Sequence, residues 1–197
     1  MVSTVSAAPK QSSGQASSLQ YLAEVTADTS PNQNLLPLSA DVNEQDHLVI
    51  GGCDVVDLVK EYGSPLYILD EHTLRTACRQ YKTSFAKHYP GESLIVYASK
   101  AWNCLAVCAI TTQEGIAIDV VSGGELQTAI AAGAKGNMLY FHGYNKSIEE
   151  LTLGLGAGAR IVVANWHELQ SLNQISTALG CMHTLAHRFL SCSLITT

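Results

Sequence analysis

Residues 94–107 read "LIVYASKAWNCLAV" and place a single lysine, Lys100, directly after an apolar run. The run over 94–99 has consecutive apolar residues, which is typical of a strand buried on both faces in a parallel sheet. Lys100 is therefore expected where this strand gives way to a loop. A cationic side chain at the end of a buried strand is the first candidate for chemistry in this chain.

Three more apolar runs follow the first at intervals of 22 residues. An interval of this length fits one strand and one helix, so the runs predict four strands joined by helices. The four runs are "LIVYAS", "IAIDVV", "MLYFHG" and "RIVVAN", centred on Ile95, Ala117, Leu139 and Ile161.

Helical patterns lie between the later runs, and each can lay one face on the sheet. One pattern has Leu126, Ala129, Ile130 and Gly133 at i, i+3, i+4 and i+7, and the other has Ile148, Leu151, Thr152 and Leu155. Capping-box spacings mark three helix starts, in the pairs Ser122 and Glu125, Ser147 and Glu150, and Asn165 and Glu168. Because each start follows a strand, these helix N-termini should face one edge of the sheet, which suits an anionic ligand.

Successive βα units with short connections indicate either an open doubly wound sheet or a (β/α)8 barrel. The segment "YASKAWNC" contains no glycine, which counts against a dinucleotide-binding fold and favours the barrel. We therefore predict an α/β fold: a partial (β/α)8 TIM-like barrel of about four βα units. Half a barrel leaves two sheet edges unpaired, so the isolated chain is expected to aggregate or recruit partners.

Composition and short patterns divide the chain into four segments. Residues 1–46, rich in Ser, Gln, Thr and Asn, are predicted to be a disordered extension. In segment 47–70, "HLVIGG" predicts a strand, "CDVVDLVKEYG" a helix ending at Gly63, and "PLYILD" a second strand. Segment 71–176, which opens with a helix, is the first half of the barrel, and 177–197 is an atypical tail.

Charge and hydropathy exclude several classes of partner. The net charge is -6, and no cluster of Lys or Arg interleaves with aromatics, so no nucleic-acid partner is expected. No apolar stretch approaches the roughly 18–20 residues of a membrane span, so a soluble protein is expected. The six cysteines lie far apart and favour reduced thiols in the cytoplasm. A plastid protein is less favoured, because no arginine precedes Arg75 in the Ser-rich N-terminal region.

Lys100 and Asp119 stand at the carboxyl ends of the first two predicted strands, where barrel enzymes place their chemistry. An amine desolvated there can form a Schiff base, but a lysine that merely reaches toward water fits the position as well. Asp119 could pair with Lys100 or with a cofactor cation. His142 ends the third strand on the same side, where a packed histidine is equally plausible.

Two other patterns resemble sites and have simpler explanations. Cys181, His183, His187 and Cys192 follow no usual zinc spacing, so no metal site is predicted. The glycines of "LGLGAGAR" over 153–160 fit a helix end and a turn better than a phosphate loop.

Three segments together resemble one enzyme family over about residues 48–175. "YASKAWN" is similar to the pyridoxal-phosphate lysine motif of the fold-type III decarboxylases, the group that shares its barrel with the alanine racemases. "DVVSGGEL" and "HGYNKSIEEL" resemble the next two segments of the diaminopimelate decarboxylase family. Alanine racemases and ornithine-type decarboxylases have different residues in the corresponding stretches. Tyr144 departs from the usual G-N-N-K-S pattern of the family.

The resemblance implies a pyridoxal 5'-phosphate-dependent carboxy-lyase, with Lys100 as the catalytic lysine that binds the cofactor covalently and Asp119 and His142 in the cofactor pocket. The implied reaction converts meso-diaminopimelate, a small amino acid, to L-lysine, the last step of lysine biosynthesis. A homodimer is implied for the full-length family member.

The length and the tail leave rival interpretations open. A barrel alone needs about 250 residues, so this chain of 197 is expected to be an N-terminal fragment with impaired or no activity. An inactive, unstable fragment and another pyridoxal-phosphate-dependent decarboxylase or racemase stay as alternatives. From Thr177 the 22-residue rhythm and the resemblance both end, which suggests a frameshifted tail.

Overall fold

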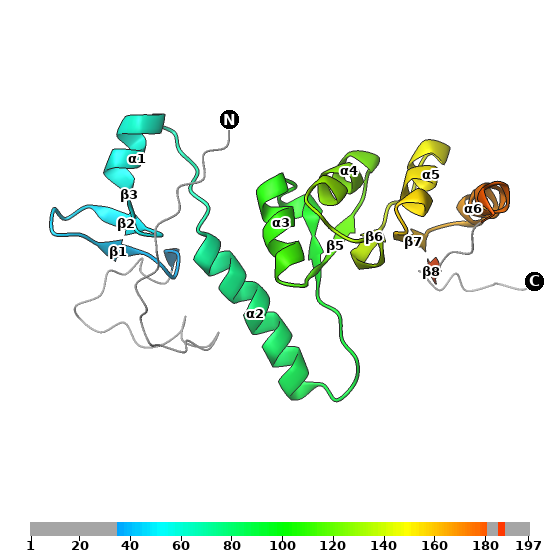
Figure 1. Ribbon diagram of the computed structural model, residues 1–197, viewed down its shortest axis with the longest axis horizontal. Helices are drawn as coiled ribbons and strands as arrows, with labels where there is room; N and C mark the ends of the chain where they lie inside the picture. Colours follow the sequence, from blue (N-terminus) through cyan, green and yellow to red (C-terminus); the bar gives the residue numbers. More distant parts are fainter. Residues whose placement is uncertain (1–34, 181–184, 188–197) are drawn as a thin grey trace, which may run out of the picture. The chain divides into compact units, whose positions relative to one another are not determined.

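The computed structural model describes residues 35–180 and 185–187 of the chain (Figure 1). It divides into two compact units, residues 1–80 and 81–197, and the boundary falls within the long helix α2, Glu71–His88. Within the described residues, no helix is both long enough and apolar enough to cross a membrane.

The first unit contains a small antiparallel sheet followed by a helix. Strands β1 (Asp41–Val42), β2 (Leu48–Ile50) and β3 (Cys53–Asp54) pair in chain order. Helix α1 (Val55–Tyr62) begins at Asp54, whose carboxylate accepts hydrogen bonds from the backbone N–H groups of Val56 and Asp57. It ends at Gly63, whose φ of 84° favours glycine. The predicted helix and its last residue are thus confirmed.

Two predictions for the first unit differ from the structure. Residues 35–46 of the predicted extension belong to this unit, because Asn43 closes a turn by accepting hydrogen bonds from the N–H groups of Gln45 and His47, and β1 then pairs with β2. Residues 1–34 lie outside the described residues. The strand predicted for "PLYILD" is absent from residues 65–70, since no described strand pairs with them there.

The second unit is a parallel five-stranded sheet with strands in chain order (Figure 1). The strands are β4 (Val96–Ala98), β5 (Ala117–Val120), β6 (Leu139–Phe141), β7 (Arg160–Val163) and β8 (Leu185–His187). The helices between them are α3 (Leu105–Gln113), α4 (Gly123–Ala131), α5 (Ile148–Gly156) and α6 (Trp166–Leu179). Single 3-10 turns, η3 (Ser99–Ala101) and η4 (Gly136–Met138), complete the connections. Four βα units and a partial barrel are therefore confirmed, and β8 adds a fifth strand.

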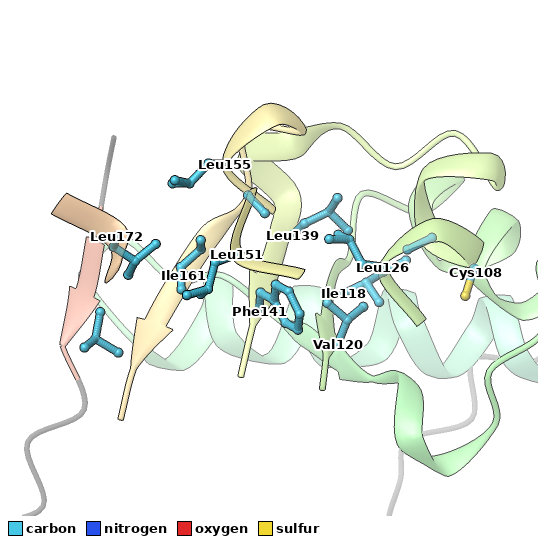
Figure 2. Packing of buried hydrophobic residues seen from close by; sticks show 13 residues of the cluster. Cys108, Ile118, Val120, Leu126, Leu139, Phe141, Leu151, Leu155, Ile161 and Leu172 are labelled. Carbon is cyan, nitrogen blue, oxygen red and sulfur yellow. The ribbon is translucent and has the colours of Figure 1, made fainter. Parts of the chain in front are cut away.

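The core of this unit lies between one face of the sheet and its helices, as Figure 2 shows for the labelled side chains. Alternate strand residues supply the sheet side, and α3, α4, α5 and α6 supply the helix side. The largest fully buried side chains include Phe141, Ile118, Leu126, Leu139, Leu151 and Ile161. The prediction that the sheet is buried on both faces holds only in part: on the opposite face Ala117 and Val162 are buried, but the polar side chains are half-buried.

The buried stripe of each helix is narrower than its pattern suggests. In α4, Leu126 and Ala129 are buried, whereas Ile130 is exposed. In α5, Leu151 and Leu155 are buried, and Ile148 is exposed at the helix start. The buried residues are three apart in α4 and four apart in α5, and both spacings keep them on one face of the helix.

Candidate functional site

The face of the sheet opposite the helices has a row of polar side chains across neighbouring strands. Asp119 of β5 is level with Ala98 of β4 and with Tyr140 of β6, and Tyr140 is level with Arg160 of β7. Residues level with each other in a parallel sheet share a face. The Arg160 guanidinium donates to the Tyr140 hydroxyl over 2.9 Å, so this row is already partly paired. The polar face meets the carboxyl edge of the strands, where Lys100 and His142 lie.

Lys100 lies in η3, two residues after Ala98, at the carboxyl end of β4. The structure thus brings Lys100 to the end of the strand that pairs with β5, as the repeat predicts. Its side chain is exposed, so the desolvation that the sequence suggested for this amine is not present in this chain. The Lys100 charge nevertheless acts on Asp119, where it lowers the carboxyl pKa.

Asp119 and His142 form a pair that the sequence did not predict. His142 Nδ1 lies 2.9 Å from Asp119 Oδ1, and the exposed fractions of the two side chains are 35% and 18%. Burial raises the pKa of the Asp119 carboxyl above its usual value, and it outweighs the opposing attraction of His142 and Lys100. The carboxylate proposed as a partner for Lys100 is therefore in direct contact with the imidazole instead.

The backbone fixes where His142 stands. Its N–H donates to the Val120 carbonyl over 2.8 Å, which extends the pairing of β5 and β6 by one residue. Gly143 then turns the chain with φ of 120°, and a Cβ there would lie 3.2 Å from the Val121 carbonyl oxygen. The sequence signal for the pair is the one-unit separation of Asp119 and His142, but only the register makes it a contact.

The raised pKa of Asp119 predicts a pH-dependent cost to folding. An ionised Asp119 is less favourable in the folded than in the unfolded chain, so stability falls as pH rises from 3.8 through the folded pKa. Asp119→Asn is therefore expected to raise the free energy of unfolding at pH 7 and to give no gain below about pH 3.8. Urea unfolding at several pH values measures this difference.

Asp70 is the matched control with the opposite sign. Burial raises the pKa of its carboxyl, but hydrogen bonds from Thr73, Ser39 and backbone N–H groups outweigh burial and lower it. Its stabilisation is present above pH 3.8 and is lost as pH falls through the folded pKa, so Asp70→Asn should destabilise at pH 7. The same sign for both variants would contradict the Asp119 prediction.

Three glutamates occupy the helix N-termini at this edge. Ser122, Ser147 and Asn165 cap α4, α5 and α6 by accepting from the N–H groups of Glu125, Glu150 and Glu168, so the predicted caps are confirmed. Each glutamate also reaches a backbone N–H just before its helix, those of Val121, Ser147 and Ala164. The expectation that these N-termini suit an anionic ligand stays a prediction, because these three N–H groups precede the helices.

The same glutamates join neighbouring units. Glu125 accepts from the Ser99 hydroxyl over 3.1 Å, and Glu150 accepts from the Gly123 N–H over 2.7 Å. Glu168 instead contacts a cation, because Lys146 Nζ lies 2.8 Å from Glu168 Oε1. Sequence reasoning gave Lys146 no part, although it stands one 22-residue interval before Glu168, which puts the two side chains in adjacent units.

The remaining sequence candidates have simple outcomes. The glycines of 153–160 end α5 and form the turn before β7, as expected, and Cys108 is a buried core residue. Of the four tail residues considered for metal, Cys181, His183 and Cys192 lie outside the described residues, and the His187 side chain is likewise not described.

The chain is similar in sequence to pyridoxal-dependent decarboxylases. A family model described as "Pyridoxal-dependent decarboxylase, pyridoxal binding domain" matches residues 71–190. A curated diaminopimelate decarboxylase of Synechocystis is 51% identical over 167 residues, covering 81% of this chain and 36% of the relative. A Bacillus subtilis diaminopimelate decarboxylase is 40% identical, covering 70% of this chain and 31% of the relative. The chain therefore spans about a third of the length of these relatives.

The chain is also similar to solved structures of diaminopimelate decarboxylases. A crystal structure of diaminopimelate decarboxylase from M. jannaschii has a TM-score of 0.69 and 29% identity, covering 77% of this chain and 36% of that one. A second structure of the enzyme from that organism, in complex with L-lysine, has a TM-score of 0.70 and 29% identity, covering 76% and 35%.

Proposed function

The chain belongs to the pyridoxal-dependent decarboxylases, and we propose that it supplies the lysine-bearing part of the cofactor site of a diaminopimelate decarboxylase. The observation that carries this proposal is the position of Lys100: an exposed primary amine at the carboxyl edge of the sheet, one strand from the half-buried carboxylate of Asp119. Residues 71–176 are proposed as the first half of the cofactor-binding barrel.

The residues at this edge fit pyridoxal 5'-phosphate in their chemistry. An aldehyde needs a primary amine that it can reach, and Lys100 is exposed. Asp119 and His142 form a titratable pair beside it, able to hold a proton or to stabilise a positive charge. Glu125, Glu150 and Glu168 bring negative charge to the N-termini of α4, α5 and α6, which makes these helix ends less favourable for a phosphate.

Each residue has a distinct proposed part. Lys100 binds the cofactor covalently through Nζ and is the catalytic residue. Asp119 lowers the energy of positive charge near Lys100 Nζ, since the two charges attract. His142 contacts the cofactor region and orients Asp119 through the 2.9 Å contact with Oδ1.

When bound, the cofactor supplies an electron sink for the bonds at the amino-acid α-carbon. The proposed reaction removes one carboxylate of meso-diaminopimelate and yields L-lysine and carbon dioxide. The proposal for the substrate comes from relatives, which are named diaminopimelate decarboxylases and include a structure in complex with L-lysine. A homodimer is proposed for the protein in which this segment is continued by the rest of the enzyme.

Covalent trapping tests the proposed lysine. The chain is incubated with pyridoxal 5'-phosphate, reduced with borohydride and digested, and the modified peptide is identified by mass spectrometry. We expect one pyridoxyl adduct on Lys100, with loss of the reducible absorbance band in Lys100→Ala.

Lys135→Ala is the matched control, since Lys135 is an exposed lysine of the same unit at the amino end of β6. It should leave the band and the adduct unchanged. Modification spread evenly over surface lysines, or no reducible band, would overturn the proposal.

A further inference from the structure

Lys146 is a cation in the interior of the second unit. The exposed fraction of its side chain is 1%, and that of its partner Glu168 is 4%. Lys146 Nζ lies 2.8 Å from Glu168 Oε1, and it donates to the carbonyls of Gly143 over 2.7 Å and of Val162 over 3.0 Å. Two of these contacts are hydrogen bonds to backbone carbonyls, and the third is an ion pair. The Phe141 ring lies beneath, with its centroid 5.7 Å from Nζ.

The three contacts join three segments behind the candidate site. The Gly143 carbonyl belongs to the β6–α5 connection, directly after His142, and the Val162 carbonyl belongs to β7. Glu168 belongs to the first turn of α6, where its second oxygen accepts from the Ala164 N–H over 2.7 Å. Lys146 therefore ties the residue that follows His142 to a strand and a helix of the next unit.

The neighbouring junction shows that a lysine is not needed simply to join two units. Between α4 and α5, Glu150 accepts directly from the Gly123 N–H, and no cation takes part. The connection at that junction, Val121 and Ser122, carries no titratable side chain. Within the described part of the second unit, the junction held by a buried lysine is the one whose connection carries His142.

A buried ion pair is weak evidence for stability, since well-packed apolar residues in its place often stabilise as much or more. A buried ion pair also fixes local geometry, because each charged group holds the groups that hydrogen-bond to it in place. We propose that Lys146 and Glu168 are positioning residues, which hold the β6–α5 connection so that His142 stays in contact with Asp119. This inference rests on the proposed function in one respect: the His142–Asp119 pair is taken to serve the cofactor site.

The Asp119 carboxyl reports whether His142 is in place. The groups that act on it are His142 and Lys100, which lower its pKa, and Glu125, which raises it; the hydroxyl of Tyr140 lies on the neighbouring strand. Lys146 and Glu168 are not among these groups. Neutralising Lys146 and Glu168 should therefore reach Asp119 only through the position of His142.

The test is an NMR titration of the Asp119 side-chain carboxyl carbon in the 197-residue chain. The variant Lys146→Met with Glu168→Gln removes both charges together, so neither is left buried and unpaired, and the glutamine can still accept from Ala164. We expect the Asp119 pKa to move upward, as far as in His142→Ala. Adding His142→Ala to the double variant should then produce no further shift.

Lys82→Met is the matched control, because Lys82 Nζ also donates to a backbone carbonyl, that of Glu114 over 2.7 Å, away from this edge. It should leave the Asp119 titration unchanged. Thermal unfolding of every variant separates a local change from loss of the fold. An unchanged Asp119 pKa in the folded double variant, or additive shifts with His142→Ala, would overturn the proposal.

This titration needs no cofactor, so it separates the two proposals. If pyridoxal 5'-phosphate is trapped on Lys100 but the Asp119 pKa does not move in the double variant, the proposed function stands and the positioning role of Lys146 and Glu168 is overturned. If the Asp119 pKa moves but no adduct forms on Lys100, the positioning role stands and the proposed function is overturned. If the variant does not fold, Glu168→Gln alone provides the same titration, with Lys146 still hydrogen-bonded to two carbonyls, and an unmoved Asp119 pKa there counts against the proposal.

Discussion

Lys146→Ala is expected to lower the free energy of unfolding by about 3–5 kcal/mol, because it leaves the Glu168 carboxylate buried and without its cation. The carbonyls of Gly143 and Val162 also lose their donor. A loss of this size is a large share of the stability of a typical domain, about 5–15 kcal/mol. Urea unfolding followed by tryptophan fluorescence measures it.

Lys60→Ala is the control for this prediction. Lys60 Nζ also lies 2.8 Å from a carboxylate, that of Asp57, but both side chains are well exposed. Exposed pairs contribute only about 0–1 kcal/mol, so this variant should unfold close to the parent. Glu168→Gln, which keeps an acceptor for Lys146 and for the Ala164 N–H, should lie between the two. Equal effects for Lys146→Ala and Lys60→Ala would show that burial adds nothing to the Lys146 pair.

Phe141→Ala is expected to cost about 3–5 kcal/mol through the cavity it leaves in the core. Phe141 is fully buried among the core side chains (Figure 2). It packs against Gly154 of α5 so closely that a Cβ at Gly154 would lie 3.0 Å from the ring. The substitution also removes the ring beneath Lys146 Nζ. The same urea unfolding experiment provides the measurement.

Two further variants grade the effect of Phe141→Ala. Phe141→Leu leaves a smaller cavity and should cost less than Phe141→Ala. Phe85→Ala removes an aromatic ring from an exposed position of α2 and should change stability by no more than about 0.5 kcal/mol. A Phe141→Ala variant as stable as Phe85→Ala would mean that the core collapses around the vacancy.

Local sequence predicted most elements of the second unit, because its signals act within a few residues. The 22-residue interval placed four strands, and the Ser or Asn to Glu spacings placed three helix starts. Failures came where an element depends on a distant partner. "PLYILD" has strand composition but no described strand to pair with at 65–70, and β1 forms because the Asn43 turn brings it to β2.

In the candidate site, too, local sequence predicted single residues but not the contacts between distant residues. Lys100 and Asp119 could be named from the sequence, since Lys100 directly follows the first apolar run and Asp119 lies at nearly the same point of the second. The partner of Asp119 could not, because the order of strands allows Lys100 or His142, and the register and the turn at Gly143 decide for His142.

The sequence by itself determined the parallel sheet, its helices and the positions of the lysine and the aspartate, because periodicity and capping are local properties. Tertiary structure alone decided which charges meet. The 2.9 Å contact of His142 with Asp119 and the 2.8 Å contact of Lys146 with Glu168 each join two units of the repeat. The physical reason is that an ion pair depends on separations of a few ångströms, which strand register and side-chain burial set.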